Sequence, residues 1–352
     1  MIHETSCDSP LGGAGEGLSS PEQSMPLVSV LMLVYNHEEF IEQAVCSVLD
    51  QKCDFPFEIV MGDDASTDGT LSRLRSLEQR YPGKLRILSS DRNLGITGNF
   101  LRTLEACHGE YIAMLEGDDY WVDKRKLQDQ VAQLNSDPSL ALSACRTKNR
   151  TFWAKAKERY TLTDLLRRYL FHTSALVFRK SCMSGFPVRP DVVALDSLLV
   201  AHLAKQGDCG FIDREMSYYR RHAAGAWSGT EISRKISNTQ AVTNSLSQSF
   251  AGRYDSELFD RELWIYGMMT NVRLDHPVLP QWKEVLRLLR PLLTRTLRYH
   301  PAGSLKNIFR ILLIPVTAGL SRLRRAVGFR TRWRLFRSRA VLSKKEKHGE
   351  AS

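Results

Sequence analysis

The sequence is short of several features that would assign it to a familiar class. Its seven cysteines are odd in number and form no C-x-x-C pair, which argues against a zinc finger or a disulfide scaffold and favours free thiols in a reducing cytosol. No basic stretch followed by an apolar core marks a secretory signal. The apolar runs fall short of the roughly 20 residues that a membrane-spanning helix needs, and no repeat with a period of about 20–50 residues suggests a solenoid or a propeller.

What the sequence does contain is the balance of a soluble globular protein. Of its residues, 43% are hydrophobic and 25% are charged. The length of 352 residues is enough for two domains or for one large α/β domain with additions. The net charge of +10 is unevenly placed, because residues 301–352 hold thirteen Lys and Arg against two acids, while the rest has 36 basic and 37 acidic side chains. A nucleic-acid-binding domain would more often carry its charge across a folded face.

Composition and patterning divide the chain into four segments. Residues 1–24 are rich in Gly, Ser and Pro and predict a disordered leader. Residues 25–229 alternate between strand and helix patterns, residues 230–300 are mainly helical, and residues 301–352 form a basic amphipathic tail.

Apolar runs and amphipathic stretches alternate through the second segment. Strands separated by helices of this length imply β-α-β crossovers and a sheet covered on both faces. The sequence therefore predicts an α/β fold with a mostly parallel, Rossmann-like sheet, whose ligands bind beyond the carboxyl ends of the strands. The predicted strands are 28–34, 57–61, 85–88, 111–115, 140–144 and 174–178, and the predicted helices are 40–49, 69–80, 97–107 and 196–206.

A first acidic pair, Asp63 and Asp64, follows the second predicted strand. A carboxylate at a strand end can accept hydrogen bonds from a base or from ribose hydroxyls. The alternative is a structural role in which Ser66 or Asp68 caps the next helix, and we expect Asp68 to be such a cap. Asp64 is harder to explain in this way, because two adjacent acids repel unless a cation or a donor lies beside them.

A second acidic group, Glu116-Gly117-Asp118-Asp119, follows the fourth predicted strand. Three acids in four residues provide the hard oxygen ligands that Mg²⁺ or Mn²⁺ prefers, and such an ion could hold a diphosphate and neutralise it as a leaving group. The alternative is a polar turn with solvated acids. The position favours a ligand site, since Asp64 and Asp119 follow different strands of one predicted sheet.

Two later residues are further candidates. Asp196 stands alone at the start of a predicted helix, where it is either an N-cap or a general base. His222 follows Tyr218-Tyr219-Arg220-Arg221 and is either structural or a ligand of a metal or a phosphate. The run His172-Thr173-Ser174 is a weaker candidate.

Taken in this order, the motifs resemble those of family 2 glycosyltransferases, which have the GT-A fold. The resemblance extends from about Leu27 to Trp227, and its ending resembles a bacterial branch with a Tyr-Arg-x-His-x-x-Gly-x-Trp pattern. The stretches that carry it are Val28–Asn36, Asp63–Thr70, Asn93–Gly95, Gly109–Ile112, Glu116–Trp121, Phe171–Arg179 and Tyr219–Ser228.

The resemblance implies a donor, a metal and a set of roles. The donor would be a nucleotide-diphosphate sugar, with a UDP-sugar expected, the metal would be Mg²⁺ or Mn²⁺, and the acceptor would be a saccharide or a lipid-linked saccharide in cell-surface polysaccharide biosynthesis. The implied roles are base stacking for Tyr35, base binding for Asp64, ribose contact for Asp118, metal binding for Asp119, general base for Asp196, and late metal or phosphate ligand for His222.

One base opposite the leaving group would give inversion, and no second acid suits a retaining hydrolase. Leu195 stands where this branch usually has Gly, so an inactive sugar-nucleotide-binding scaffold is the alternative function. A nucleotidyltransferase would need a Gly-rich triphosphate loop, which the sequence lacks.

The basic tail predicts membrane association. Phe329, Trp333 and Phe336 recur at helical spacing among arginines, the pattern of an interfacial helix on an anionic membrane. A solvated charged tail is the alternative, and nothing in the body supports nucleic-acid binding by the same arginines. We expect a cytoplasmic protein held peripherally on the inner face of the membrane.

Overall fold

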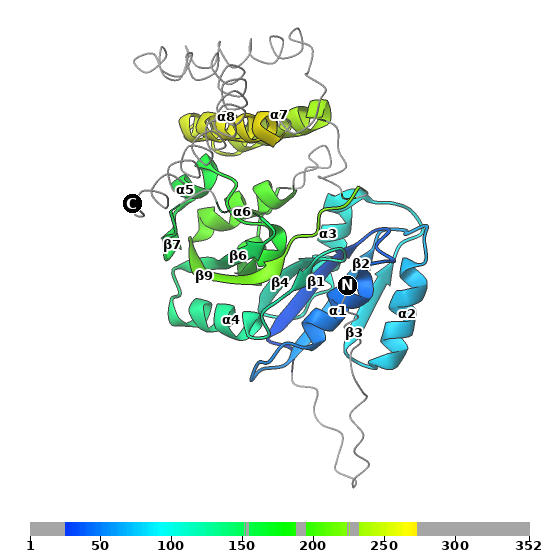
Figure 1. Cartoon of the computed structure of the whole chain (residues 1–352). Helices are drawn as coiled ribbons and strands as arrows, with labels where there is room; N and C mark the ends of the chain where they lie inside the picture. Colours follow the sequence, from blue (N-terminus) through cyan, green and yellow to red (C-terminus); the bar gives the residue numbers. More distant parts are fainter. Residues whose placement is uncertain are drawn as a thin grey trace, which may run out of the picture. The chain divides into compact units, whose positions relative to one another are not determined.

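The computed structural model describes residues 25–150, 152, 155–187, 195–223, 225 and 232–272 (Figure 1). The chain divides into two compact units at Leu258 and Phe259. Of the second unit, only residues 259–272 are described. The predicted leader, the basic tail, residues 273–300 and Trp227 lie outside the described residues.

A sheet of nine strands forms the centre of the first unit in the described part of the chain. The strands are β1 (Val28–Val34), β2 (Phe57–Asp63), β3 (Leu85–Ser89), β4 (Tyr111–Glu116), β5 (Tyr120–Trp121), β6 (Leu140–Lys148), β7 (Arg159–Tyr160), β8 (Val177–Arg179) and β9 (Asp208–Tyr218). Their order is β3-β2-β1-β4-β8-β6-β9-β5, with β7 on β9. The first four in this order and the β6–β9 pair are parallel, and β8 is antiparallel to both its neighbours.

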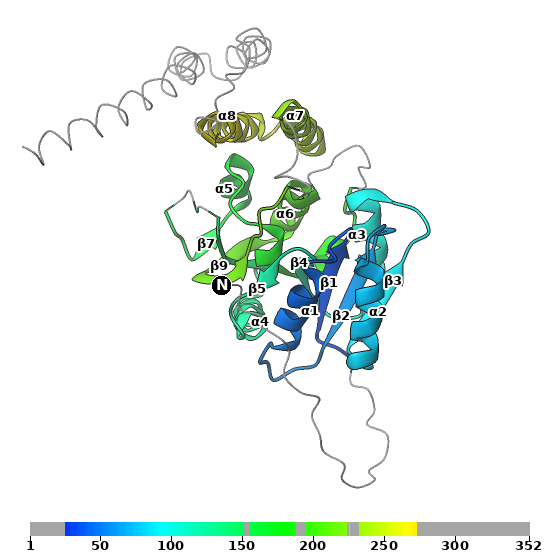
Figure 2. The ribbon, with the colours of Figure 1, turned by 45° about the vertical axis from the view of Figure 1, so that its right-hand side comes forward.

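Helices cover both faces of the sheet, as Figures 1 and 2 show. The helices of the described residues are α1 (Ile41–Leu49), α2 (Thr70–Arg80), α3 (Gly95–Glu105), α4 (Lys126–Ser136), α5 (Leu162–Arg167), α6 (Leu195–Gln206), α7 (Ile232–Ser249) and α8 (Asp255–Val272). Of these, α7 packs on α6 and not on the sheet. Because side chains alternate along a strand, Val30 and Met32 of β1 pack against α1, α2 and α4, while Leu31 packs on the side of α3 and α6. The predicted α/β fold with a mostly parallel sheet is confirmed.

The predicted strand at 174–178 is wrong at its start. Thr173–Ala175 form a short 3-10 helix, η1, in which the Ser174 amide donates a hydrogen bond to the His172 side chain, and β8 begins only at Val177. The sequence patterns also gave no indication of α4 or β9. The middle of β9 carries exposed charged residues around Arg214, so it lacks a continuous apolar run.

Close packing of α3 against β2 fixes the position of the first acidic pair. A Cβ atom on Gly62 would lie 2.1 Å from Thr103 Oγ1, so only glycine allows this approach. Asn99 of α3 donates a hydrogen bond of 2.7 Å to the Gly62 carbonyl oxygen, and Arg102 donates one of 2.6 Å to that of Asp63. The end of β2 is therefore tied to α3.

The predicted free thiols are found at five described cysteines, namely Cys53, Cys107, Cys145, Cys182 and Cys209. For Cys46 the prediction is wrong, because this cysteine is in a disulfide.

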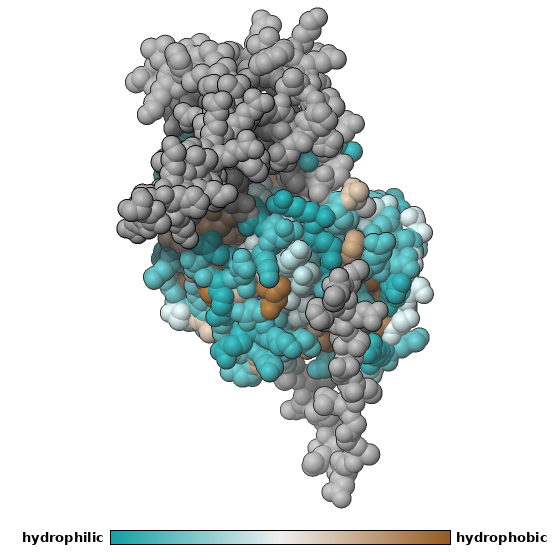
Figure 3. All heavy atoms as spheres, viewed as in Figure 1, coloured by the Kyte–Doolittle hydropathy of each residue, from teal (hydrophilic) through white to brown (hydrophobic). Residues whose placement is uncertain are grey.

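The surface is largely hydrophilic on the face that Figure 3 shows, with separate hydrophobic spots. Tyr35 is one of five large hydrophobic side chains that are exposed among the described residues, at 44%. No described helix has the length and apolar character needed to cross a membrane.

Candidate active site

The carboxyl ends of three parallel strands bring both acidic groups to one edge of the sheet. In the strand register, Val34 of β1 lies beside Asp63 of β2, and Leu33 of β1 lies beside Glu116 of β4. The sequence-predicted residues after β1, β2 and β4 therefore share this edge, as expected for ligand sites in parallel sheets.

In the first pair, Asp64 has a partner for each carboxylate oxygen. Oδ1 accepts from the Leu94 amide at 2.7 Å and Oδ2 from the Gly95 amide at 3.0 Å. These amides open α3, where a negative charge is favourable. Asp63 accepts one bond of 3.3 Å from the Ser66 amide. Asp64 thus has a structural role, and each of its oxygens keeps a second lone pair for another donor.

The loop after Asp64 starts α2. The N-cap of α2 is Gly69, not the predicted Asp68, whose Oδ1 accepts from the amide of the first helical residue, Thr70, at 3.0 Å. Across the loop, Asn36 adopts a positive φ of 55°, and its side chain accepts from the Thr67 amide at 2.8 Å. These contacts fix the turn that follows the exposed Tyr35 at the end of β1.

In the second group, Glu116 and Asp119 lie with His172, their ligand atoms within 4.8 Å of one another. One oxygen of each acid is engaged: Thr173 Oγ1 donates to Glu116 Oε1, and the Arg220 amide donates to Asp119 Oδ1 at 2.9 Å. The second oxygens, Glu116 Oε2 and Asp119 Oδ2, are buried without a hydrogen-bond partner among the described residues.

His172 brings its Nδ1 atom to this cluster. Nδ1 lies 3.3 Å from Asp119 Oδ2, 2.8 Å from the Ser174 hydroxyl oxygen and 3.3 Å from the Ser174 amide nitrogen. Burial, and then the charge of Arg150, lowers the pKa of His172 to about 3, which keeps the ring neutral. A proton on one of these two atoms, or a cation between them, would make the contact of Nδ1 with Asp119 Oδ2 favourable.

The carboxyl groups of the cluster resist ionisation. Burial is the largest cause that raises the pKa of Glu116 to about 8, and the charges of Asp118 and Asp196 add to it. Burial, with the charges of Glu116 and Asp118, also raises the pKa of Asp119 well above its ordinary value. A cation beside these carboxyl groups would favour their ionised forms.

Asp118 lies at the more accessible side of the same loop, between two histidines. Its Oδ2 is 3.0 Å from His222 Nε2 and 3.8 Å from His37 Nε2, and its side chain is 15% exposed against 1% for Asp119. His222 also packs on Phe40, with ring centroids 4.7 Å apart. The structure therefore places the predicted ligand His222 on Asp118 rather than directly on Asp119.

Asp196 lies near the beginning of α6, and its Oδ1 accepts from the adjacent Ser197 amide at 2.6 Å. An N-cap would instead accept from the second or third residue beyond it. Burial raises the pKa of Tyr169 well above its ordinary value, and the charge of Asp196 and a hydrogen bond to it raise it further. Because the charge of Asp196 also acts on Glu116, the predicted base and the acidic group belong to one electrostatic neighbourhood.

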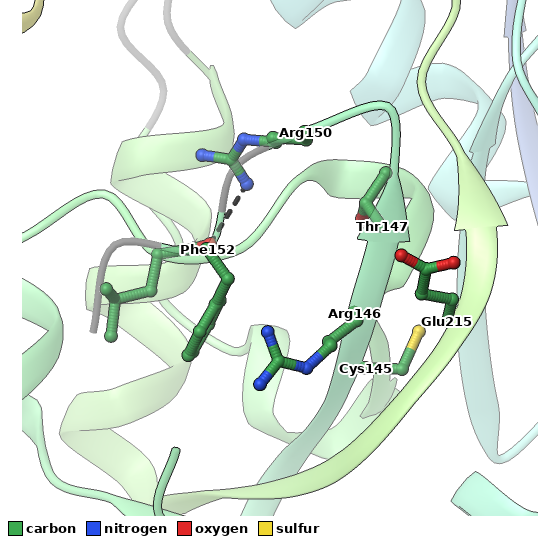
Figure 4. A pocket seen from close by; sticks show the side chains of 7 residues that line it. Cys145, Arg146, Thr147, Arg150, Phe152 and Glu215 are labelled. Atoms are coloured by element: carbon green, nitrogen blue, oxygen red, sulfur yellow. Dashed lines mark hydrogen bonds between the residues drawn. The ribbon is translucent and has the colours of Figure 1, made fainter. Parts of the chain in front are cut away.

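A small cavity of about 40 Å³ lies beside β6 and β9 (Figure 4). Arg150 borders it, stacks 4.5 Å over the Tyr169 ring and donates to the Leu170 carbonyl oxygen at 3.0 Å. None of the sequence-predicted site residues lines this cavity. Its lining is Cys145, Arg146, Thr147, Arg150, Phe152, Leu170 and Glu215.

Four residues that the structure brings to the acidic group have a weak signal or none in the sequence. His172 lies in a run that is only a weak candidate, and Arg220 is a neighbour of the candidate His222. His37 and Tyr169 are in no pattern that singles out their side chains. Only their contacts with Asp118, Asp119 and Asp196 mark them.

Comparisons with known proteins bear on the family of the chain. A family model described as "Glycosyl transferase family 2" matches residues 29–188. An uncharacterized protein of Mycobacterium tuberculosis is 33% identical over 219 residues, which cover 59% of this chain and 62% of that relative. A Bacillus subtilis protein described as "Putative teichuronic acid biosynthesis glycosyltransferase TuaG" is 38% identical over 106 residues, 30% of this chain and 41% of that one.

Solved structures share the fold. TarS 1–349 of S. aureus, in complex with UDP-GlcNAc, matches with a TM-score of 0.59 and 17% identity over 84% of this chain and 92% of that chain. The mannosyltransferase PcManGT of Pyrobaculum calidifontis, in complex with GDP-Man and Mn²⁺, matches with a TM-score of 0.55 and 19% identity over 86% and 88%. These likenesses confirm the GT-A fold expected from the sequence.

Proposed function

Because the chain belongs to glycosyltransferase family 2, we propose that it transfers a sugar from a nucleotide-diphosphate donor to a saccharide or lipid-linked acceptor. One observation carries this proposal. Glu116 and Asp119, which have unpartnered buried oxygens, share their electrostatic neighbourhood with Asp118 of the same loop and with a carboxylate from another element, Asp196. That is the chemistry required to hold a diphosphate and to deprotonate an acceptor.

The donor is proposed to be a UDP-sugar. Structural neighbours hold UDP-GlcNAc and, with Mn²⁺, GDP-Man, which supports a nucleotide sugar in general. In this chain the exposed ring of Tyr35 would stack on the base, a spare lone pair of Asp64 would accept from it, and Asp118 would contact ribose hydroxyls.

The residues present fit a divalent cation. The unpartnered oxygens of Glu116 and Asp119 and the neutral ring of His172 would hold Mg²⁺ or Mn²⁺. His222, fixed by Asp118, would contribute a further contact to the metal or the phosphate. When bound, the metal supplies neutralisation of the departing diphosphate.

The proposed reaction is a direct displacement with inversion. Asp196 would take the proton of the acceptor hydroxyl, whose oxygen forms a bond to the anomeric carbon as the bond from that carbon to the diphosphate breaks. General-base assistance contributes roughly 10²–10⁴-fold in rate. Tyr169, hydrogen-bonded to Asp196, would orient the carboxylate toward the acceptor.

The acceptor is proposed to belong to cell-surface polysaccharide biosynthesis. The printed name of the B. subtilis relative connects that protein to teichuronic acid biosynthesis, which supports this class. The chain spans 62% of the length of its mycobacterial relatives. The acceptor class is therefore a proposal and is not taken over from those relatives.

The protein is proposed to act in the cytoplasm on the inner face of the membrane. The segment 301–352, which lies outside the described residues, carries thirteen basic side chains, each worth about 1 kcal/mol near an anionic surface before screening. The full chain should pellet with anionic vesicles and detach as salt rises, whereas a chain ending at His300 should not pellet. Equal binding by both would exclude the tail as the anchor.

The test of the function is incubation of the full chain with a panel of nucleotide sugars and Mn²⁺ or Mg²⁺, with release of the nucleoside diphosphate as the readout. Hydrolysis or transfer from at least one donor supports the proposal. Binding without turnover of any donor, with or without candidate acceptors, favours an inactive sugar-nucleotide-binding scaffold, for which Leu195 before the base is the sequence feature.

A further inference from the structure

Arg220 contacts the acidic loop, Glu116–Asp119, through both its backbone and its side chain. Its amide donates to Asp119 Oδ1 at 2.9 Å, and its Nε donates to the Asp118 carbonyl oxygen at 2.8 Å. One residue therefore holds the carboxylate of Asp119 and the backbone of Asp118 at the same time.

The far end of the same side chain is fixed on α1. Nη2 of Arg220 donates to Gln43 Oε1. The guanidinium carbon lies 4.6 Å from the centre of the Phe40 ring and 5.2 Å from that of the Tyr120 ring. The planar group is thus held by two aromatic rings and two hydrogen bonds. It connects the acidic loop to α1 and to the ring that His222 also contacts.

The direction of the Asp119 carboxylate follows from this contact. With Oδ1 engaged by the Arg220 amide, Oδ2 is left on the side of His172, at 3.3 Å from Nδ1. The described ion pairs of the chain do not include Arg220, and its side-chain hydrogen bonds go to neutral oxygens. The role of the side chain is therefore to place the loop, and its charge offsets the repulsion among the three acids without pairing with one of them.

We propose that Arg220 is a positioning residue that fixes Asp118 and Asp119 for metal and donor binding, an inference that rests on the proposed function. Lysine cannot replace it, because an ammonium group lacks the planar fork that stacks and donates in two directions. Residues that orient metal ligands from outside typically cost 10- to 100-fold in metal affinity when they are changed.

The experiment is a titration of the full-length chain with Mn²⁺ alone, in which free Mn²⁺ is followed by electron paramagnetic resonance. The variants are Arg220→Lys and Arg220→Met. Arg146→Lys is the matched control, because Arg146 also stacks on an aromatic ring, Phe152, and pairs with a side chain, Asp213, but borders the cavity in Figure 4 instead of the acidic loop. Both Arg220 variants should bind Mn²⁺ about 10- to 100-fold more weakly than wild type, and the control should bind it as wild type does.

Mn²⁺ binding by Arg220→Lys equal to that of wild type would overturn the proposal. A wild-type chain that binds no Mn²⁺ would instead contradict the metal in the proposed function. For that case a second measurement decides on Arg220. Hydrogen exchange of the amides of residues 117–120 in the metal-free chain should be at least about tenfold faster in Arg220→Lys than in wild type or Arg146→Lys, because the loop loses its attachment. Unchanged exchange there would also overturn the proposal.

Discussion

The two aspartate pairs, Asp63-Asp64 and Asp118-Asp119, are identical in sequence but differ in the hydrogen-bond donors that surround them. Asp64 accepts two backbone amides at the start of α3. Asp119 accepts one, and its other oxygen is buried opposite a neutral histidine. The first carboxylate is satisfied by the protein itself, whereas the second leaves an acceptor that only a proton or a cation can satisfy.

The difference arises from the element that approaches each pair. Two amides at the start of a helix meet Asp64, and they favour its negative charge. A second acid, Glu116, and the ring of His172 meet Asp119, and burial with the charge of Glu116 raises its pKa well above the ordinary value. An Asp-Asp motif therefore indicates a cation site only where the carboxylates lack hydrogen-bond donors from the protein.

The largest expected effect is on turnover and comes from Asp196, which belongs to neither aspartate pair. Asp196→Asn should lower kcat by roughly 10²–10⁴-fold, because it removes the general base, and it should leave donor binding unchanged, since a base acts only when the acceptor proton moves. Turnover and calorimetric titration with the donor identified in the panel are the measurements. A loss of donor binding equal to that of Asp119→Asn would show that Asp196 is misassigned.

The next effect concerns the second pair. Asp119→Asn should weaken metal-dependent donor binding by roughly 100-fold, the upper end of the range for residues that support a metal site. In a chelator, binding of the nucleotide alone should be the same in wild type and variant. A variant that keeps its metal-dependent binding would place the cation elsewhere, with Asp118 and His222 as the remaining ligand pair.

The same substitution in the two pairs should change the stability of the metal-free protein in opposite directions. Asp64→Asn should destabilise it by about 1–3 kcal/mol, because an NH₂ group would replace an acceptor of a buried amide. Asp119→Asn should stabilise it at pH 7. The folded-state pKa of Asp119 is raised, so ionisation above the unfolded-state pKa favours the unfolded chain. Urea unfolding in EDTA measures both, and a change of the same sign in both would refute the contrast.

The smallest effect concerns the partner of the base. Tyr169→Phe should lower kcat about fivefold, the equivalent of one neutral hydrogen bond of about 1 kcal/mol, with the donor KM unchanged. Steady-state kinetics measure this. A changed donor KM with unchanged kcat would mean that Tyr169 serves donor binding rather than Asp196.

Much of the fold was predictable because its apolar residues follow helix and strand periods. The strand at Val28–Val34 was predicted with its observed bounds, and the helix at 69–80 to within one residue. β9 was missed because its middle is charged and exposed, so its period is hidden. The sequence also gave no sign that Ser174 would leave the predicted strand to donate to the His172 side chain.

The positions of the acidic residues in the site could be predicted from the sequence, but their contacts with other side chains could not. Asp64, Asp118 and Asp119 follow strands, so their common sheet edge could be deduced from the parallel order. The approach of His172 and Arg220 depends on η1 and on the end of β9, and neither was predicted. Which carboxylate oxygen lacks a donor is set by those long-range contacts, which no local pattern encodes.

The most direct test of the account is a calorimetric titration of UDP and GDP into the full-length chain with Mn²⁺ and with EDTA. If the acidic loop holds a metal-bound diphosphate, one of these nucleotides will bind in Mn²⁺, the binding will weaken in EDTA, and Asp119→Asn in Mn²⁺ will resemble wild type in EDTA. If neither nucleotide binds in either condition, or if EDTA and Asp119→Asn leave the binding unchanged, the account is contradicted.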